Sequence, residues 1–366
     1  MSGTRAAVAD GAAGFAIEEI EVGDPGPGEV LVRLCASGIC HTDYDLMREA
    51  RHPFVLGHEG AGEVERVGAG VSGVAPGDRV LLQWANPCGG CFQCVRGRFV
   101  LCEQRGLTAG GHAHAEATRR RGEPLTRAFN LGTLAEATVV QSTAVIRIDA
   151  DMPMSSACLL GCGVMTGYGS VVNAARVEPG SSVVVLGAGG VGLNVVQAAR
   201  IRGATAIIAV DLTRERLETA RRFGATHLIV ADHDDANLTS VAENVRGVTG
   251  GRGADYAFEC TAVPELGAAP LAMVCHGGTA IQVSGVEQTI PVDMRLFEWD
   301  KTYLNPLYGQ CNPAIDFDRL VSLYAAGELL LDELITQTYT LEQLPEAFDD
   351  LLAGRNAKGI VLLEAD

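Results

Sequence analysis

Basic side chains and long apolar runs are both scarce in this sequence. Its 366 residues include 28 Lys and Arg against 45 Asp and Glu, a formal net charge of -17 at pH 7. That charge repels nucleic-acid phosphates and anionic membranes, so we expect neither as a partner. No apolar stretch is long and glycine-free enough to predict a membrane span, and the first residues lack a signal peptide's charged start and apolar core. We therefore expect a cytoplasmic protein.

Apolar residues and cysteines, by contrast, are plentiful. Hydrophobic residues make up 47% of the chain, which at this length is enough for two domains with sizeable cores. In a chain with no export signal, 11 cysteines indicate reduced thiols and metal ligands instead of a disulfide framework.

The stretch CHTDYDLMREARHPFVLGHE, residues 40–59, carries a cysteine and a histidine suited to zinc. Gly57 lets the backbone approach closely just before His58, and Cys40 supplies a thiolate. We expect Cys162, in GCGVMTGYG, to be the third ligand, because it directly precedes a dinucleotide-binding unit. Three protein ligands leave a fourth position for substrate, as in catalytic zinc sites. Taken singly, Cys40 is as well explained as a buried small hydrophobe and His58 as a hydrogen-bonded core histidine.

A second group of cysteines lies in CGGCFQCVRGRFVLC. Three of them follow C-x-x-C-x-x-C spacing and a fourth comes a few residues later: Cys88, Cys91, Cys94 and Cys102. Four thiolates close a tetrahedral site with no position for substrate, so this spacing predicts a structural zinc. An iron-sulfur cluster is the competing interpretation.

A glycine-rich turn between a β-branched strand and an amphipathic helix predicts a dinucleotide-binding site in SSVVVLGAGGVGLNVVQAARIRG. Gly187 permits the tight turn, Gly189 lets a pyrophosphate approach the backbone, and Gly192 lets helix and strand pack. The pyrophosphate faces the helix N-terminus, here Gly190 and Val191.

The next strand, AIIAV, ends at Asp211, where a carboxylate can accept hydrogen bonds from both adenosine ribose hydroxyls. The same carboxylate repels the extra phosphate of NADP, although Arg214 and Arg216 soften that preference. We therefore expect NAD.

The chain as a whole predicts an α/β protein of two domains. Short β-rich runs and Gly/Pro turns fill residues 1 to about 150, and the polar segment 106–127, with His112 and His114, is interpreted as a loop without an assigned role. Alternating strands and helices, including a helix over 263–275, then predict a doubly wound parallel sheet. We place the domains at 1–165 and 166–303, with 304–366 returning to the first.

These motifs, in this order, resemble the zinc-dependent alcohol dehydrogenases of the medium-chain dehydrogenase/reductase superfamily over essentially the whole chain. The resemblance rests on GHEGAGEVERVGAGV, the four-cysteine lobe, GCG, and GAGGVG followed by Asp211. It implies a GroES-like catalytic domain, a Rossmann domain, NAD and two zinc ions per subunit. Cys40, His58 and Cys162 would hold the catalytic zinc, a ligand set already known in alcohol dehydrogenase. Glu59 would lie behind that metal, and Asp43 would orient His58.

The resemblance also implies roles for residues around the reacting groups. Thr42 would hydrogen-bond the substrate alcohol, Trp84 would line its pocket, and Asp45 would end the proton relay. As ordinary alternatives, Thr42 is a turn residue, Trp84 a core aromatic and Asp45 a solvated carboxylate at a helix start. Residues near the cofactor by the same resemblance are Arg216 at the adenosine ribose, and His41 and Lys358 at the phosphates.

The implied activity is reversible hydride transfer between an alcohol and NAD+, giving an aldehyde or ketone. An alternative is oxidation of a formaldehyde-thiol adduct, as in the class III branch, for which Arg105 would assist. A noncatalytic relative should have lost metal ligands, whereas all seven candidates are present. We expect a small-molecule alcohol or aldehyde as partner and a homodimer or homotetramer.

Overall fold

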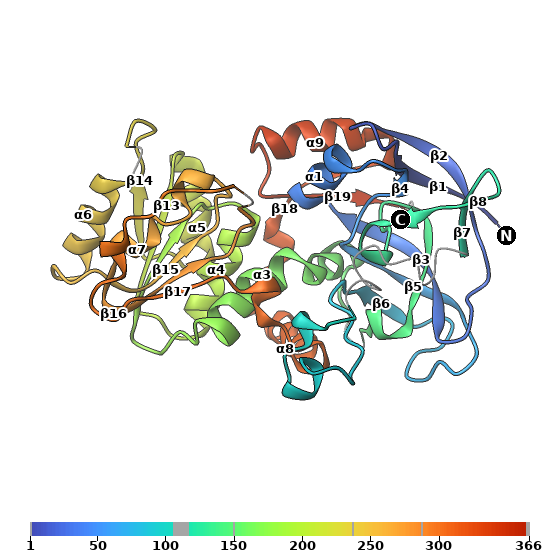
Figure 1. The fold of residues 1–366 in the computed structure, drawn as a ribbon, viewed down its shortest axis with the longest axis horizontal. Coiled ribbons are helices and arrows are strands. Elements are labelled where there is room, and N and C mark those ends of the chain that lie inside the picture. The colour runs from blue at the N-terminus through green and yellow to red at the C-terminus, as the bar shows by residue number, and fades with distance from the viewer. Residues whose placement is uncertain (1, 105–116, 149–150, 236–237, 287, 364–366) are drawn as a thin grey trace. The chain divides into compact units, whose positions relative to one another are not determined.

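The computed structural model describes residues 2–104, 117–148, 151–235, 238–286 and 288–363 (Figure 1). The chain forms two compact units, one made of Met1–Cys162 with Asn312–Asp366 and the other of Gly163–Cys311. The boundaries between these units, after Cys162 and after Cys311, differ slightly from the domain boundaries inferred above at 165/166 and 303/304. The inferred domain boundaries stay a prediction. Arg105, His112 and His114 lie outside the described residues.

The first unit is built on two sheets, both mainly antiparallel. One has the strand order β8-β7-β2-β1-β4-β9, with bounds β8 (Glu123–Pro124), β7 (Thr118–Arg120), β2 (Phe15–Val22), β1 (Ser2–Ala9), β4 (Phe54–Val55) and β9 (Thr126–Arg127). The other has the order β11-β6-β5-β3-β19-β18, with bounds β11 (Val145–Arg147), β6 (Arg79–Leu82), β5 (Gly60–Val67), β3 (Glu29–Gly38), β19 (Lys358–Leu362) and β18 (Ile335–Tyr339). The strand β10 (Ala137–Gln141) also pairs with β3.

Strand β3 is the centre of this unit because both of its faces are buried. Val32 and Leu34 pack in one cluster with Val64 of β5 and Val80 of β6, whereas Leu31 faces a second cluster with Val8 of β1. A strand covered on both sides reads as a nearly continuous apolar run, which explains the segment EVLVRLC.

The C-terminal segment completes the first unit. Its helices are α8 (Pro313–Ala325) and α9 (Leu344–Leu352), and its last strand, β19, pairs antiparallel with β3. Phe348 and Leu344 of α9 pack in one cluster with Met47 of α1 (His41–Glu49). This pairing of β19 with β3 brings Lys358, the first residue of β19, next to Ile39, which follows β3.

The second unit is a six-stranded parallel sheet in the order β14-β13-β12-β15-β16-β17. The strands are β12 (Ser182–Leu186), β13 (Ala206–Asp211), β14 (His227–Val230), β15 (Ala254–Glu259), β16 (Val274–Gln282) and β17 (Thr302–Leu304). The helices are α3 (Gly163–Gly169), α4 (Gly190–Ile201), α5 (Arg214–Phe223), α6 (Thr239–Val248) and α7 (Pro270–Met273). Val184 and Leu186 of β12 pack with α6, while Val185 faces Gly192 of α4, so both faces of the sheet are buried. This is a doubly wound Rossmann sheet with the classical strand order.

The helix predicted over 263–275 is wrong in extent. The segment forms a 3₁₀ turn, Pro264–Leu266, and a single helical turn, α7, before β16 begins at Val274. Pro270 has no N–H to donate to a preceding helical turn, so it starts a new helix instead of continuing one.

Among the described residues, no single helix is long and apolar enough to cross a membrane. One bent pair, Met154–Gly161 with Gly163–Ala174, has the length and composition of such a span. Most of its side chains are buried in the protein.

Candidate active site and metal centres

Three of the predicted zinc ligands meet in the first unit, although they come from separate segments. The ligand atoms of Cys40, His58, Glu59 and Cys162 all lie within 4.8 Å of one another. Cys40 immediately precedes α1, His58 and Glu59 lie between β4 and β5, and Cys162 follows the 3₁₀ turn Cys158–Gly161. Two thiols and one imidazole in such a cluster fit the donor set of a catalytic zinc.

Gly57 shapes the backbone that presents His58. Its φ of +96° is in the left-handed region, and a Cβ there would lie 2.3 Å from the Leu134 nitrogen. Its N–H donates to Asp43 Oδ1 at 3.2 Å, and its carbonyl accepts from the Thr133 N–H at 2.9 Å. The close backbone approach expected of Gly57 is therefore present, against Leu134.

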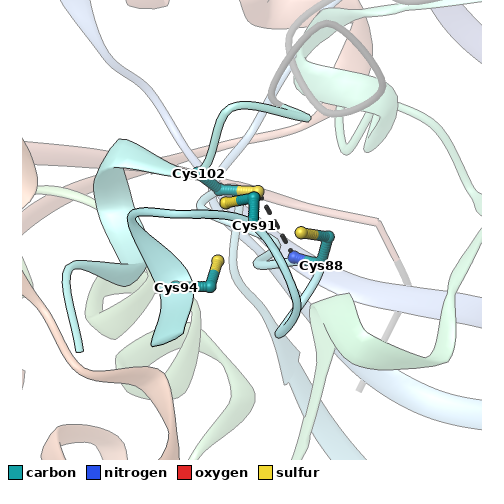
Figure 2. Close-up of side chains that lie close together, drawn as sticks. All are labelled: Cys88, Cys91, Cys94 and Cys102. Atoms are coloured by element: carbon teal, nitrogen blue, oxygen red, sulfur yellow. Dashed lines mark hydrogen bonds between the residues drawn. The ribbon is translucent and has the colours of Figure 1, made fainter. Parts of the chain in front are cut away.

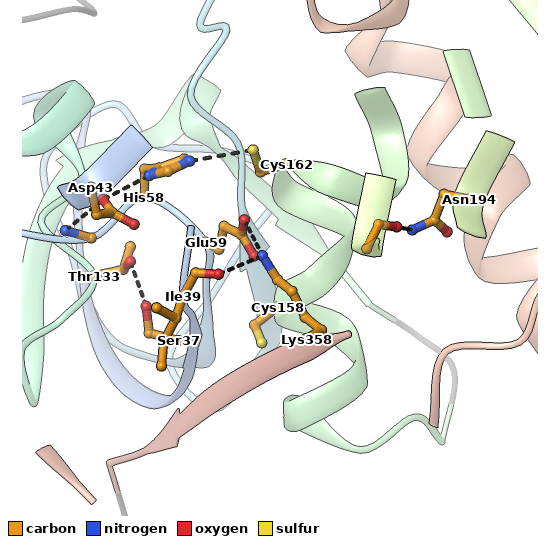
Figure 3. Close-up of polar contacts among 12 residues, drawn as sticks. Ser37, Ile39, Asp43, His58, Glu59, Thr133, Cys158, Cys162, Asn194 and Lys358 are labelled. Carbon is orange, nitrogen blue, oxygen red and sulfur yellow. Dashed lines mark hydrogen bonds and ion pairs between the residues drawn. The ribbon is translucent and has the colours of Figure 1, made fainter. Parts of the chain in front are cut away.

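Asp43 orients His58 through a buried contact. The His58 Nδ1 and Asp43 Oδ1 atoms are 2.8 Å apart, and both side chains are almost completely buried (Figure 3). This contact leaves Nε2 directed at Cys162 Sγ, 3.3 Å away. Burial opposes a charge on His58, but Asp43 and Cys40 together outweigh it and raise the histidine pKa well above its usual value. The arrangement is that of a carboxylate holding a metal-binding imidazole.

The two sulfur atoms of the site share a hydrogen bond. This bond lowers the pKa of Cys40 well below that of an ordinary thiol and raises that of Cys162. The negative charge favoured on the Cys40 sulfur attracts a cation, and zinc binding would displace the proton that the two sulfur atoms share.

Glu59, the fourth member of the cluster, pairs with Lys358. The Glu59 Oε1 and Lys358 Nζ atoms are 2.6 Å apart, and the ammonium also donates to the Ile39 carbonyl at 2.9 Å (Figure 3). Burial raises the pKa of Glu59 to about 7. Loss of water opposes a charge on Lys358, yet the Glu59 carboxylate raises the pKa of the lysine. Oε2 of Glu59 is buried without a hydrogen-bond partner among the described atoms. Lys358 is thus placed with the zinc-site residues, and its contact with a cofactor phosphate stays a prediction.

The second cluster contains the three cysteines at C-x-x-C-x-x-C spacing and, as the fourth member, Cys102. The sulfur atoms of Cys88, Cys91, Cys94 and Cys102 lie within 4.8 Å of one another (Figure 2). Backbone N–H groups point at them, from Cys88 to Cys102 Sγ at 3.3 Å and from Glu103 to Cys91 Sγ at 3.4 Å. The Glu103 N–H lowers the pKa of Cys91 to about 6, whereas burial raises that of Cys94 to about 12. All 11 cysteines are free thiols, and this closed set of four fits a structural zinc.

The glycine motif of the second unit has the geometry that a dinucleotide requires. Gly187 has φ of +89°, and a Cβ on Gly192 would lie 1.8 Å from the Gly187 carbonyl oxygen. A Cβ on Gly189 would meet nothing within 4 Å, so the surface above it is open. Helix α4 begins at Gly190 and Val191, and its first N–H groups are available to an anion. These features fit the pyrophosphate of NAD.

Asp211 ends β13 next to this glycine turn. Its Oδ2 accepts the Ala188 N–H at 2.9 Å, and its Oδ1 accepts the Thr213 N–H at 3.1 Å. Arg216 Nη1 lies 3.8 Å from Oδ2. The carboxylate therefore holds the turn, and its contact with the adenosine ribose stays a prediction.

Helix α1 carries three of the residues implied only by the resemblance. Thr42 is half-buried, whereas His41 and Asp45 are exposed. Loss of water around the carboxyl raises the pKa of Asp45 above that of an ordinary aspartate. None of these positions contradicts the expected roles, which stay predictions.

Phe129 is a site residue that the sequence analysis missed. Its ring lies 5.0 Å from that of His58 and 5.3 Å from that of Trp84, measured between centroids. Phe129 has φ of +52°, which is strained for a bulky side chain and is a feature that concentrates at functional sites. The segment RAFNLG has no motif that would have revealed this placement.

A Cys₂His cluster, a separate Cys₄ cluster and a Rossmann sheet together define a zinc-dependent oxidoreductase that uses a dinucleotide. Residues 26–150 match the family model of the alcohol dehydrogenase GroES-like domain, and residues 190–322 match that of the zinc-binding dehydrogenases. The NDMA-dependent alcohol dehydrogenase of Amycolatopsis methanolica is 38% identical, over 99% of this chain and 100% of that protein. The class-3 alcohol dehydrogenase of Myxine glutinosa is 36% identical, over 95% and 94%.

Solved structures agree with these relatives. The crystal structure of benzyl alcohol dehydrogenase from Acinetobacter calcoaceticus is 30% identical, covers 100% of both chains and has a TM-score of 0.90. The chain belongs to the zinc-type alcohol dehydrogenases of the medium-chain dehydrogenase/reductase superfamily.

Proposed function

We propose that this enzyme oxidises a small alcohol with NAD+ and reduces the corresponding aldehyde or ketone in reverse, with Cys40, His58 and Cys162 as the ligands of its catalytic zinc. The observation that carries the proposal is the cluster of these three side chains within 4.8 Å, with the buried Asp43 carboxylate behind the imidazole. The four-cysteine cluster is proposed to hold the second, structural zinc.

Bound zinc supplies a Lewis acid that lowers the pKa of an oxygen ligand, and bound NAD+ supplies the hydride acceptor. Asp43 holds His58 in the tautomer that keeps Nε2 free as a ligand. Glu59 and Lys358 form an ion pair beside the two thiols and the imidazole. Thr42 is proposed to take the alcohol proton into a relay that ends at Asp45.

We propose an aromatic primary alcohol as the first substrate class to test. The rings of Trp84 and Phe129 lie side by side and Phe129 contacts the His58 ring, so flat apolar surface adjoins the metal ligands. The relative from Acinetobacter calcoaceticus is named for benzyl alcohol.

The test is NADH formation by zinc-loaded protein with benzyl, allylic, primary aliphatic and polyol alcohols, together with metal analysis. Activity with two zinc ions per chain supports the proposal; absence of alcohol-dependent reduction of NAD+ contradicts it. Because one relative is named for NDMA, a parallel assay with NDMA as acceptor separates slow NADH release from slow chemistry.

The formaldehyde-thiol alternative keeps one supporting observation, the 36% identity to a class-3 enzyme. Formaldehyde with and without a carboxylate-bearing thiol distinguishes the two. Thiol-dependent oxidation that exceeds alcohol oxidation would favour the alternative.

We further propose a cytoplasmic homodimer or homotetramer that binds neither nucleic acid nor membrane. The net charge of -17 supports the second part, because it disfavours anionic partners. Analytical ultracentrifugation measures the subunit number.

Asp211→Gly is expected to narrow the preference for NAD over NADP by about tenfold or more, because it removes a carboxylate that repels the extra phosphate. The ratio of kcat/KM for the two cofactors is the measurement. Asp232→Gly, which removes an exposed carboxylate beyond β14, is the control and should leave the ratio unchanged. An unchanged ratio in Asp211→Gly would reject the role.

Asp45→Ala is expected to slow alcohol oxidation by about tenfold to a hundredfold if Asp45 ends the relay. Loss of water raises its pKa, Glu49 raises it further, and His41 and Arg48 oppose the rise. Any acid limb it contributes therefore lies above the ordinary aspartate range, and Asp45→His should move that limb to about pH 6.5.

The measurement is a pH series of the rate with protiated and deuterated alcohol, since an isotope effect shows that hydride transfer is observed. Equal isotope-sensitive rates in wild type, Asp45→Ala and Asp45→His would leave Asp45 as a surface residue.

A further inference from the structure

Glu259 lies at the position in the Rossmann sheet where this fold binds ligands. Ligands of open α/β sheets bind outside the carboxyl ends of the strands, where the strand order reverses, which here is between β12 and β15. Leu186 and Glu259 are the last residues of these strands and pair with each other. Glu259 is nonetheless completely buried.

Neutral donors hold the buried carboxylate. Oε1 accepts the N–H and the hydroxyl of Thr261, each at 2.5 Å, and Oε2 accepts the Ser284 hydroxyl. Thr261 follows β15 and Ser284 follows β16. Glu259 therefore ties together two segments that leave the sheet at its ligand-binding edge.

One of these segments packs directly against the glycine turn. A Cβ on Gly187 would lie 3.0 Å from Thr261 Cγ2 and 3.1 Å from the Cys260 carbonyl carbon. The Cys260 N–H also donates to the Leu186 carbonyl at 2.9 Å. Thr261 therefore packs against the glycine turn that is proposed to bind the pyrophosphate. A shift of Thr261 would change the packing of that turn.

The other end of β15 carries a matched pair with the same chemistry. Asp255 Oδ2 accepts the N–H and the hydroxyl of Ser182 at 2.8 and 2.7 Å. This pair joins β15 to β12 at the amino edge of the sheet, away from the carboxyl ends where ligands bind. It provides a structural comparison without a role in binding.

We propose that Glu259 is a positioning residue for the cofactor: it holds the Thr261 and Ser284 segments in the arrangement that receives NAD. Burying a carboxylate without a cation among its hydrogen-bond partners is unfavourable, so the contacts of Glu259 must offset that cost. An apolar side chain would avoid the cost, but it could not hydrogen-bond both segments. The inference rests on NAD being the cofactor, as proposed above.

The experiment measures the Kd of NADH by fluorescence titration of zinc-loaded protein, and Tm in parallel, for Ser284→Ala, Ser284→Thr and Ser182→Ala. Ser284→Ala deletes one hydrogen bond to the carboxylate and is expected to raise the Kd about tenfold. Ser284→Thr keeps the hydroxyl and should bind NADH like the wild type. Ser182→Ala removes a hydroxyl that donates to Asp255 and accepts its N–H, so it should lower Tm at least as much but leave the Kd within about twofold.

A Kd for Ser284→Ala within about twofold of wild type, or equal weakening in Ser182→Ala, would overturn the positioning role. Glu259→Gln tests the carboxylate directly. It replaces one accepting oxygen by an amide nitrogen and should also weaken NADH binding. If the wild type binds no NADH, the proposed cofactor fails and the positioning role fails with it; wild-type binding with unaffected variants rejects the positioning role alone.

Discussion

Replacing His58 by alanine is expected to reduce alcohol oxidation by about a thousandfold or more. A Lewis acid contributes several kcal/mol to stabilising negative charge on oxygen, and each 1.36 kcal/mol corresponds to a factor of ten in rate. His58 is buried, lies 3.3 Å from Cys162 and shares its ligand cluster with Cys40. Its loss removes one of three protein ligands, so zinc content should fall from two toward one ion per chain.

The control is His233→Ala, because His233 is a largely exposed histidine on the surface of the other unit. It should keep both zinc ions and full activity. Asp43→Ala leaves the ligand set intact but removes the carboxylate that contacts His58 Nδ1 and accepts the Gly57 N–H, so a loss of about tenfold to a hundredfold is expected. Full activity in zinc-loaded His58→Ala would contradict the assignment of the catalytic site.

Cys94→Ser is expected to destabilise the first unit strongly while leaving the catalytic ligands in place. Loss of a structural metal is among the few single changes that lower the free energy of unfolding by about 4 kcal/mol or more. For a unit of this size, such a loss lowers Tm by about 10 °C. Cys94 is buried among the other three sulfur atoms, where a hydroxyl cannot replace a thiolate ligand.

Zinc content and thermal unfolding check this prediction, with Cys275→Ser as the control. Cys275 is partly buried and belongs to neither metal cluster. It should keep two zinc ions and a nearly unchanged Tm. Cys94→Ser protein with two zinc ions and wild-type Tm would show that the four-cysteine cluster is not a structural zinc site.

Features encoded by neighbouring residues could be predicted well from the sequence. The four cysteines are confined to 88–102, so the chain between them has little freedom and its spacing alone predicts that they meet. The turn from Gly187 to Gly192 is likewise local, because a left-handed φ and a close helix-strand approach each require glycine at a defined position. The helix predicted over 263–275 is wrong for a reason that is also local, because Pro270 cannot donate a hydrogen bond to a preceding helical turn.

Contacts between distant residues depended on the tertiary structure. Lys358 reaches Glu59 across 299 positions only because β19 pairs with β3, and a strand's partner is selected by burial of its whole face. The placement of Phe129 against His58 and Trp84 follows from a strained turn that no local pattern indicates.

The sequence by itself therefore determined the chemical inventory, namely seven candidate zinc ligands and a glycine turn followed by an acid, because these depend on residue type and short spacing. The tertiary structure alone decided which side chains support them. The pairing of Glu59 with Lys358, the aromatic wall beside His58 and the hold of Glu259 on two segments arise from packing of elements far apart in the chain. Such packing is selected by the burial of whole faces, to which any single residue contributes little.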